Sequence, residues 1–422
     1  MKGGSVDLKT GDLLWPALTQ NAPGFGRLEE DCRCEVAIIG GGITGALMAV
    51  ALAEEGIETV VVDRRKPGMG STAACTALVL YEIDQPLVQL EQDVGTAHAR
   101  RAYRATRRAL DDLAEVIARY EIDCGLKRRG SLYLAKKDKD VDWFAEEIEA
   151  RRQIGIEVEL ILRDELEERF GLRRPGAIHS PAAWEVDPYR LTLGLLENAA
   201  ELGVRVFQET DAEPEDLSEH KQVLRASKGA RIVCDRVVIA TGYETPEEFR
   251  PVGKYCKLHS TYVLASEPLE EGIEPWADSM VIWETGDPYL YARRAGKRVI
   301  VGGADEPFSD AKKRDTLIEK KIGVLMEQFS TLCPGIRIIP ERVWAGTFAT
   351  TEDGLPYIGT LRQWPGCRFA LGYGGNGLTF SMLAAQIISD DILGRDNIES
   401  ELFQFDRDGL QTRGGHHERV KS

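Results

Sequence analysis

The amino-acid sequence predicts an α/β protein, α+β overall, in which a doubly wound domain is interleaved with a domain built on a mixed antiparallel sheet. Short β-branched strands alternate with helices in residues 34–90, 187–248 and 341–400, which is typical of a doubly wound sheet. Strand-rich blocks fill residues 125–186 and 249–340, which favours a mixed sheet there. We therefore expect two domains, each made of segments that are separate in the sequence.

Composition and charge exclude several classes of partner. The chain has 422 residues, 43% of them hydrophobic and 29% charged, as in a soluble protein of two domains. Its net charge is −16, so the protein lacks the excess of positive charge that would attract phosphate groups. Neither nucleic acid nor an anionic membrane is therefore expected as a partner. The start, M-K-G-G-S-V-D-L-K-T-G-D, lacks the apolar core of a secretory signal, which predicts a cytoplasmic location. The eight cysteines lack metal-ligand spacing and are expected to be reduced.

The order of elements around residue 40 predicts how the doubly wound domain begins. The apolar run Val36–Ile39 suits a buried strand, and a helix over Ile43–Glu55 follows it. A second strand, Thr59–Val62, ends in Asp63. Glycines interrupt the uncharged run 36–53 and acids flank it, so we expect no membrane span.

Three glycines between this strand and helix have the G-x-G-x-x-G spacing of a dinucleotide site. Gly40 permits a tight turn, Gly42 lets the backbone approach a pyrophosphate, and Gly45 lets the helix pack closely on the strand. The helix N-terminus adds free N–H groups and the positive end of a dipole. Asp63 lies 18 residues after Gly45, where a carboxylate can bind a ribose hydroxyl. We expect a bound dinucleotide; the alternative is a tight turn without a ligand.

Periodicity and turn residues predict the other elements. Helices are expected at 87–121, 142–152, 163–170, 189–202, 312–329 and 378–393, and strands at 127–135, 179–186, 204–207, 233–240, 258–265, 280–283, 289–293, 298–301, 343–348, 357–358 and 368–371. Asp187 is expected to cap the helix that Pro188 begins. Residues 1–33 are predicted to be an irregular leader on the surface and residues 409–422 a disordered tail. The arginines within 100–108 are expected to form a solvated face offset by acids.

Six sequence blocks carry a resemblance to a known family. The first is I-G-G-G-I-T-G with Asp63. The others are G-M-G-S-T-A-A-C-T-A from Gly68, V-D-P-Y-R-L-T from Val186, V-V-I-A-T-G from Val237, W-A-G-T-F-A-T-T-E-D-G-L-P-Y-I-G from Trp344 and G-Y-G-G-N-G-L-T from Gly372. In this order they resemble the FAD-dependent oxidoreductases of the D-amino-acid oxidase, glycine oxidase and sarcosine oxidase (DAO) family, over about residues 34–395.

The resemblance implies FAD as the dinucleotide, in a Rossmann-type domain, and a flavin-mediated oxidation. A C–H beside an amine nitrogen gives hydride to flavin N5, and the imine is hydrolysed in water. The implied cofactor-binding residues are Gly40, Gly42, Ile43, Thr44, Gly45, Asp63, Arg64, Gly70, Ser71, Thr72, Gly242, Gly374, Gly375, Asn376, Gly377, Leu378 and Thr379. At Gly377, converging N–H groups and a helix N-terminus would stabilise the reduced ring. No protein acid or base is nominated.

Three positions depart from the family pattern. Phe348 stands where many members carry an Arg that clamps a carboxylate. Gly346 stands where monomeric sarcosine oxidases attach the flavin to a Cys, so the FAD is expected to be non-covalent. Ile300 stands where the same enzymes carry a Lys that assists oxygen, which leaves oxygen and another electron acceptor both open.

The candidates for the substrate side are Tyr81, Glu82, Tyr289, Tyr291, Arg293 and Phe348. Strand alternation places Tyr289, Tyr291 and Arg293 on one face, and Arg293 or Arg294 could replace the missing clamp. The alternative for each is a structural role. His259 is expected to be a hydrogen-bonded strand residue and not a base.

The function expected from these features is oxidation of a small amine or amino acid. An FAD-dependent dehydrogenase of a 2-hydroxy acid or polyol phosphate is an alternative, because the carboxylate clamp is missing at Phe348. A flavoprotein subunit without its own turnover is the alternative from another class.

Overall fold

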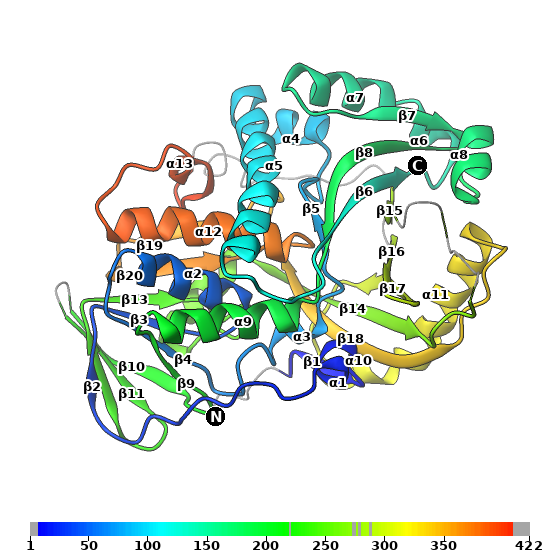
Figure 1. Ribbon diagram of the computed structural model, residues 1–422. Helices are drawn as coiled ribbons and strands as arrows, with labels where there is room; N and C mark the ends of the chain where they lie inside the picture. Colours follow the sequence, from blue (N-terminus) through cyan, green and yellow to red (C-terminus); the bar gives the residue numbers. More distant parts are fainter. Residues whose placement is uncertain (1–6, 219–220, 272–275, 277–279, 287–288, 408–422) are drawn as a thin grey trace.

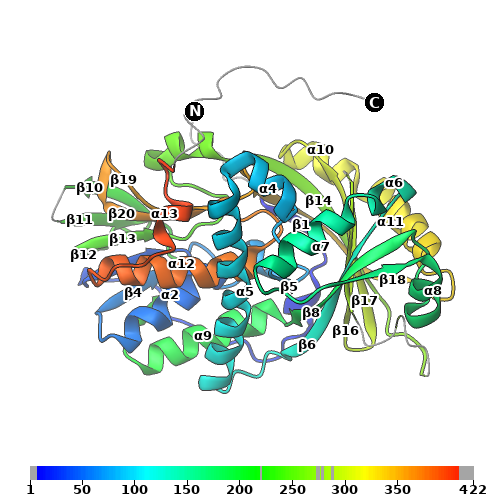
Figure 2. The ribbon, with the colours of Figure 1, turned by 90° about the horizontal axis from the view of Figure 1, so that it is seen from above.

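Within the described residues, three sheets organise the fold (Figure 1). The computed structural model describes residues 7–218, 221–271, 276, 280–286 and 289–407. The predicted tail, residues 409–422, lies outside them. Seen from above, the doubly wound part and the large antiparallel part lie side by side, with α4 (Leu87–Val94) and α5 (Thr96–Arg119) over their junction (Figure 2).

The doubly wound domain is built on a six-stranded sheet that is parallel except at one edge. Its order is β19 (Tyr357–Leu361), β20 (Trp364–Leu371), β13 (Arg236–Ile239), β3 (Val36–Ile39), β4 (Thr59–Val62) and β9 (Arg205–Phe207), with only β19 antiparallel. Helices α2 (Ile43–Glu54), α9 (Pro188–Glu201) and α12 (Gly377–Ile392) pack together on one face. The Asp187 carboxylate accepts hydrogen bonds from two N–H groups of α9, which confirms the predicted cap.

A small second sheet covers the other face, with the order β10 (Ala212–Leu217), β11 (Gln222–Ala226), β12 (Arg231–Cys234) and β2 (Cys32–Arg33). This explains why β3 reads as a continuous apolar run. Val36 and Ile38 pack toward the helices, and Ala37 and Ile39 pack toward the small sheet. The single strand predicted over 233–240 is therefore wrong: β12 and β13 belong to different sheets.

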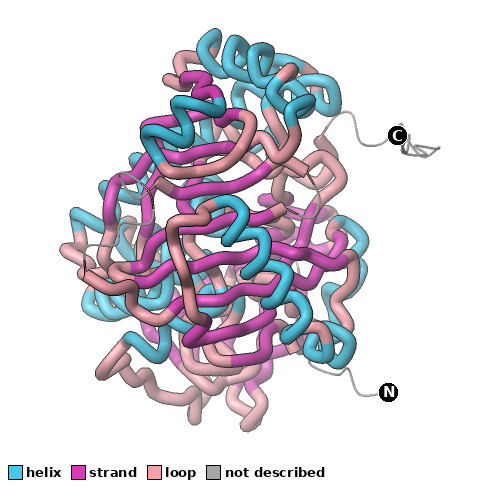
Figure 3. Tube along the Cα trace, turned by 90° about the vertical axis from the view of Figure 1, so that its right-hand side faces the viewer, coloured by secondary structure: helices cyan, strands magenta, loops and turns pink. Residues whose placement is uncertain are grey.

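The second domain is a mixed sheet with the order β1 (Lys9–Gly11), β18 (Pro340–Thr350), β14 (Lys257–Ser266), β17 (Arg298–Glu306), β16 (Leu290–Ala295), β15 (Val281–Glu284), β6 (Lys127–Leu134), β8 (Gly176–Glu185) and β5 (Leu78–Leu80), while β7 (Glu159–Leu162) pairs with β8. Helices α10 (Ala311–Thr316) and α11 (Ile318–Leu332) accompany it. In Figure 3 a long helix crosses one face of this sheet; Leu325 and Phe329 of α11 pack there on Tyr262 and Leu264. The opposite face looks toward the doubly wound domain.

The N-terminal segment is more ordered than the predicted surface leader. Its strand β1 pairs antiparallel with β18, Lys9 opposite Gly346. Helix α1 (Leu14–Leu18) follows, and its Trp15 is buried and donates a hydrogen bond from Nε1 to the Cys75 carbonyl oxygen at 2.6 Å. Two of the three residues of β1, Lys9 and Gly11, are of types that are depleted in strands, so contacts with distant parts of the chain define this element.

The helix predicted over 87–121 is two helices, because Gly95 adopts φ 88° between α4 and α5. The arginines of α5 form the predicted solvated face: Arg100 contacts Glu91 at 2.6 Å and Arg107 contacts Asp111 at 2.7 Å. The remaining helices are α3 (Ser71–Ala74), α6 (Asp138–Val141), α7 (Phe144–Gln153), α8 (Arg163–Phe170), η1 (Glu247–Tyr255) and α13 (Ser400–Phe403). In the part of the chain that the structure describes, no helix is long and apolar enough to cross a bilayer.

Candidate active site

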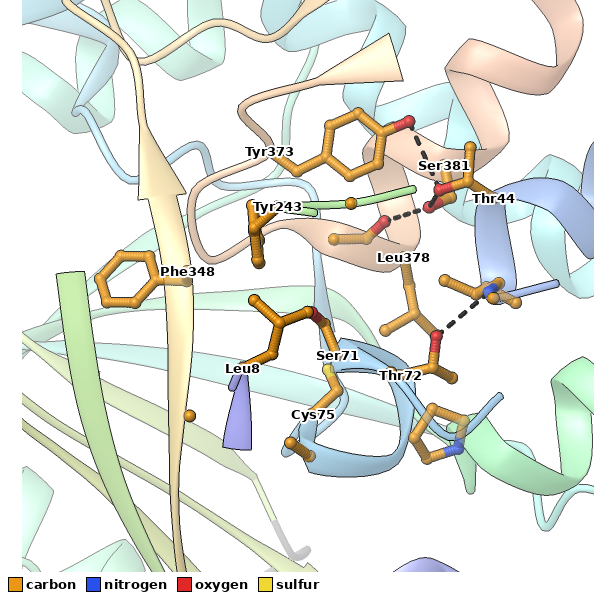
Figure 4. A pocket seen from close by; sticks show the side chains of 18 of the residues that line it. Leu8, Thr44, Ser71, Thr72, Cys75, Tyr243, Phe348, Tyr373, Leu378 and Ser381 are labelled. Carbon is orange, nitrogen blue, oxygen red and sulfur yellow. Dashed lines mark hydrogen bonds between the residues drawn. The ribbon is translucent and has the colours of Figure 1, made fainter. Parts of the chain in front are cut away.

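A long cavity lies between the carboxyl ends of β3, β4 and β13 and the inner face of the large sheet. Its walls also include the start of α12, the segment around Ser71 and, from the N-terminal segment, Leu8 (Figure 4). The cavity therefore lies where open α/β sheets bind ligands, at the carboxyl ends of the strands.

One end of the cavity is lined by Asp63 and two arginines. The Asp63 carboxylate accepts hydrogen bonds from the Gly41 N–H at 2.8 Å and the Arg65 N–H at 2.7 Å. Burial raises the pKa of Asp63, and these two N–H groups oppose that rise. Arg65 binds both oxygens of Glu244, at 2.5 and 2.7 Å, and Arg64 lies 3.7 Å from the same carboxylate. Asp63 is thus held in place to accept hydrogen bonds from a ligand.

In the middle of the cavity, Gly40, Gly42 and Gly70 leave the backbone uncovered by side chains, and we call these three residues the glycine trench. Gly40 has φ 110°, and a Cβ on it would overlap the Ala240 carbonyl. A Cβ on Gly42 would lie 3.2 Å from the Thr72 hydroxyl oxygen. A Cβ on Gly70 would have no atom of another described residue within 4 Å, apart from its chain neighbours. Gly45 does not line the cavity; its missing Cβ lets α2 pack against the Gly40 carbonyl.

Hydroxyl groups beside this trench are positioned for a polar ligand. Thr72 accepts a hydrogen bond from the Ile43 N–H at 3.1 Å, at the first turn of α2. The Oγ atoms of Ser71 and Thr241 are buried and have no hydrogen-bond partner among the described residues. Buried polar atoms normally have partners, so these two hydroxyls fit a polar group bound beside them. The trench, the hydroxyls and Asp63 together suit a dinucleotide.

The first turn of α12 forms the next part of the wall. Asn376 donates from Nδ2 to the Glu82 carbonyl oxygen at 2.7 Å, and Thr379 donates to the Leu80 carbonyl oxygen at 2.6 Å. These bonds fix the helix start against the end of β5. Residues 374–378 line the cavity, but Thr379 does not. Figure 4 shows Thr44 joined to Ser381, at 2.8 Å, and to the Tyr373 hydroxyl.

Four of the six predicted substrate-side residues line the cavity: Glu82, Tyr289, Tyr291 and Phe348. Arg293 does not. Its buried guanidinium donates to the carbonyl oxygens of Thr76 and Val186, so it fastens the sheet to neighbouring loops instead of clamping a ligand. Tyr81 is also buried outside the cavity lining, where Arg151 donates to its hydroxyl at 3.3 Å.

His259 is the hydrogen-bonded strand residue that the sequence predicted. Its Nε2 lies 2.9 Å from the Thr350 hydroxyl, and its ring stacks on Phe348. Sequence reasoning did not nominate several residues that line the cavity: Leu8, Asp84, Thr261, Asp305, Tyr243 and Tyr373. Three of these had a local signal: Asp84 lies two residues after the nominated Glu82, Tyr373 lies in the block that begins at Gly372, and Tyr243 follows the block that ends at Gly242.

Comparison with known proteins agrees with this geometry. The model of a family described as FAD dependent oxidoreductase (DAO) matches residues 35–391. The chain is 25% identical over 380 residues to gamma-glutamylputrescine oxidoreductase of Escherichia coli (strain K12), covering 88% of this chain and 86% of that relative. It is 27% identical over 374 residues to glycine oxidase of Bacillus licheniformis, covering 86% and 94%.

A solved structure shares the fold. L-proline dehydrogenase from P. horikoshii matches with a TM-score of 0.74 at 21% identity, over 89% of this chain and 97% of that one. The family model matches residues 35–391 of the 422-residue chain, which is most of its length. The chain belongs to the DAO family of FAD-dependent oxidoreductases.

Proposed function

We propose that this FAD-dependent oxidoreductase oxidises the C–N bond of a small amine or amino acid, at the end of the cavity enclosed by α12 and the large sheet. The observation that carries the proposal is the continuity of the cavity from Asp63, past the glycine trench, to an aromatic chamber at Trp283 and Tyr291. The names of the two curated relatives, gamma-glutamylputrescine oxidoreductase and glycine oxidase, support an amine as the substrate.

The cofactor-binding residues are proposed in three groups along the cavity. Asp63 and Arg64 would hold the adenosine end. Gly40, Gly42, Ile43, Thr44, Gly70, Ser71, Thr72 and Gly242 would hold the pyrophosphate and its surroundings, and Gly374, Gly375, Asn376, Gly377 and Leu378 would hold the ring. Gly45 and Thr379 would act indirectly, through the packing of α2 and the hydrogen bond to β5.

When bound, FAD supplies the two-electron acceptor for the reaction. The chain then has to orient the substrate and keep water away. The first two residues of α12, Gly377 and Leu378, line the cavity, and the N-terminus of this helix would stabilise negative charge there. The aromatic rings of Tyr291, Trp283 and Tyr373 line that end together with acidic side chains. These residues bind and position the substrate; none of them is required as a catalytic base.

Anaerobic loss of flavin absorbance on mixing with candidate substrates tests the proposed reaction. We expect small amines or amino acids to bleach the bound flavin in a single turnover, because the electrons stay on the ring when no acceptor is present. A parallel panel of 2-hydroxy acids and polyol phosphates should leave the spectrum unchanged. Bleaching by that panel alone would overturn the proposal, and bleaching by neither would favour a subunit without turnover.

Non-covalent attachment of FAD is a separate prediction. Gly346 offers no nucleophile, and the thiol of Cys75, which lines the cavity, accepts a hydrogen bond from the Ala77 N–H at 3.3 Å. Burial raises the pKa of Cys75, which disfavours the reactive thiolate. Acid precipitation should therefore leave a white pellet and a yellow supernatant. A yellow pellet that stays yellow after washing would contradict this.

A further inference from the structure

Acidic side chains line the substrate end of the cavity, and no cationic side chain lines that end among the residues that the structure describes. We call the residues Glu82, Asp84, Trp283, Tyr291 and Asp305 the acidic chamber; all five line the cavity. Among the described lining residues, the cationic side chains are Arg64 and Arg65, both beside Asp63 at the other end. A carboxylate on the substrate would thus lie beside acidic side chains with no cation in the described lining to bind it.

Asp84 is held at the loop that begins α12. Its carboxylate accepts a hydrogen bond from the Gly375 N–H at 2.6 Å. A Cβ on Gly374 would overlap the same carboxylate, so a glycine is needed for this approach. Burial raises the pKa of Tyr291, and the nearby charges of Asp305 and Asp84 add to that rise. The loop proposed to hold the flavin ring therefore also binds the Asp84 carboxylate and fixes its position at the substrate end of the cavity.

Glu82 brings a second carboxylate to the chamber from a buried network. Its Oε1 accepts a hydrogen bond from Ser131 and lies 3.8 Å from the Arg151 guanidinium. Arg151 is shared, because it also binds Glu147 at 2.7 Å. The Oε2 of Glu82 is buried and, within the described part of the chain, has no hydrogen-bond partner. A buried carboxylate oxygen without a donor is a place where a ligand N–H group would bind.

Aromatic rings complete the chamber. Trp283 lies opposite Tyr133 in the register of β15 and β6, and the two rings stack with centroids 3.7 Å apart. Ser131, which binds Glu82, precedes Tyr133 by two residues and so lies on the same face of the sheet. Tyr291 pairs with Trp283 across β16 and β15. Carboxylates beside electron-rich rings are a combination that binds ammonium groups.

We propose that the acidic chamber selects an α,ω-diamine, binding its distal ammonium between Asp84, Glu82 and the ring of Trp283, over amines that end in a methyl group or a carboxylate. The inference rests on the proposed function. The nitrogen that is oxidised must be neutral before its neighbouring C–H can leave as hydride, so it cannot balance the chamber's negative charge. A second, permanently protonated nitrogen can.

Three four-carbon amines test the proposal, because they share the reacting end: 1,4-diaminobutane, n-butylamine and 4-aminobutanoate. Each is mixed anaerobically with the FAD-loaded enzyme to measure flavin reduction, and its binding is measured separately by calorimetry. We expect the diamine to bind about tenfold more tightly than butylamine, and 4-aminobutanoate to bind most weakly. Equal or tighter binding of 4-aminobutanoate would overturn the proposal.

The two inferences fail in different ways. If the diamine binds most tightly but no amine reduces the flavin, the C–N oxidation is wrong and the cation preference stands. If amines reduce the flavin but all three bind alike, the cation preference is wrong and the oxidation stands.

Asp84→Asn tests the carboxylate itself. The variant keeps the volume and an acceptor for the Gly375 N–H, so it should fold, and it should weaken diamine binding about tenfold while leaving butylamine binding unchanged. Asp93→Asn, an exposed acid on α4, is the matched control and should change neither. An Asp84→Asn enzyme with an unchanged preference for the diamine would contradict the proposal.

The pH dependence of binding gives an independent readout. Burial raises the pKa of Asp84 to about 6, opposed by the Gly375 N–H. The other titratable groups of the chamber are Glu82, Asp305 and the Tyr291 phenol. The Tyr133 phenol lies behind the lining, and burial raises its pKa, with the charge of Asp84 adding to that rise. An alkylammonium stays protonated far above this range. The ratio of diamine to butylamine affinity should therefore increase as the pH rises through about 6 and then level off, because the titration of the reacting nitrogen is common to both amines, and the Asn variant should lack this step. A step of the same size in the variant would assign it to another group.

Discussion

Replacing Gly42 with aspartate should yield a folded, colourless protein that retains no FAD. The Cα of Gly42 stands at the first turn of α2, and a Cβ there points at Thr72, whose hydroxyl already accepts the Ile43 N–H. The new carboxylate would therefore lie in the trench, against the proposed position of the pyrophosphate. Two like charges at that separation repel, and the helix N-terminus cannot stabilise both. Flavin content per chain, read from the absorbance ratio after gel filtration, measures the effect.

Gly26→Asp is the control for this substitution. Gly26 also lacks a positive φ, and a Cβ on it would meet open space, so the same change of charge occurs on the surface. That variant should stay yellow and active. A Gly42→Asp protein that purified with stoichiometric FAD would place the pyrophosphate elsewhere.

Replacing Asp353 with asparagine should lower the free energy of unfolding by about 3–5 kcal/mol, the usual cost of breaking a buried ion pair. Asp353 belongs to the D-G-L-P block that resembles the family signature, yet it does not line the cavity. Its two oxygens accept hydrogen bonds from the Arg407 guanidinium, each at 2.8 Å, and the two side chains are 2% and 1% exposed. The asparagine would leave Arg407 buried without its counter-charge.

Chemical denaturation at saturating FAD measures this loss, because bound cofactor otherwise shifts the apparent stability. Glu352→Gln, at the exposed neighbouring position, is the control and should change stability by less than about 0.5 kcal/mol. An Asp353→Asn variant as stable as the control would show that Arg407 is satisfied by its carbonyl contacts alone.

The sequence-based predictions agree with the structure for elements that are determined by residues close together in the sequence. The β3–α2–β4 unit, the cap at Asp187 and the start of α12 follow from residues close in sequence. Strand β1 could not be predicted in this way, because its pairing partners are residues 344–346 of β18. The split between β12 and β13 likewise depends on two different sheets.

The same distinction between local sequence and packing of distant segments applies to the residues of the candidate site. The glycine trench was predicted because each glycine acts through its own backbone. The distinction between Arg293, which is buried in carbonyl contacts, and Asp84, which lines the cavity, depends on how distant loops pack against the sheet. Strand alternation placed Tyr291 correctly but could not show that loop carbonyls would take up the guanidinium two residues later.

The position of Leu8 has a consequence for assembly of the binding site. Leu8 lines the cavity, and its carbonyl oxygen accepts a hydrogen bond from the Thr347 N–H at 2.8 Å. This part of the cavity wall is therefore missing until the segment around Leu8 has packed against β18, which begins only at Pro340, far later in the sequence. Capture of the flavin by the nascent chain would then be a late, post-synthetic event that requires nearly the whole polypeptide.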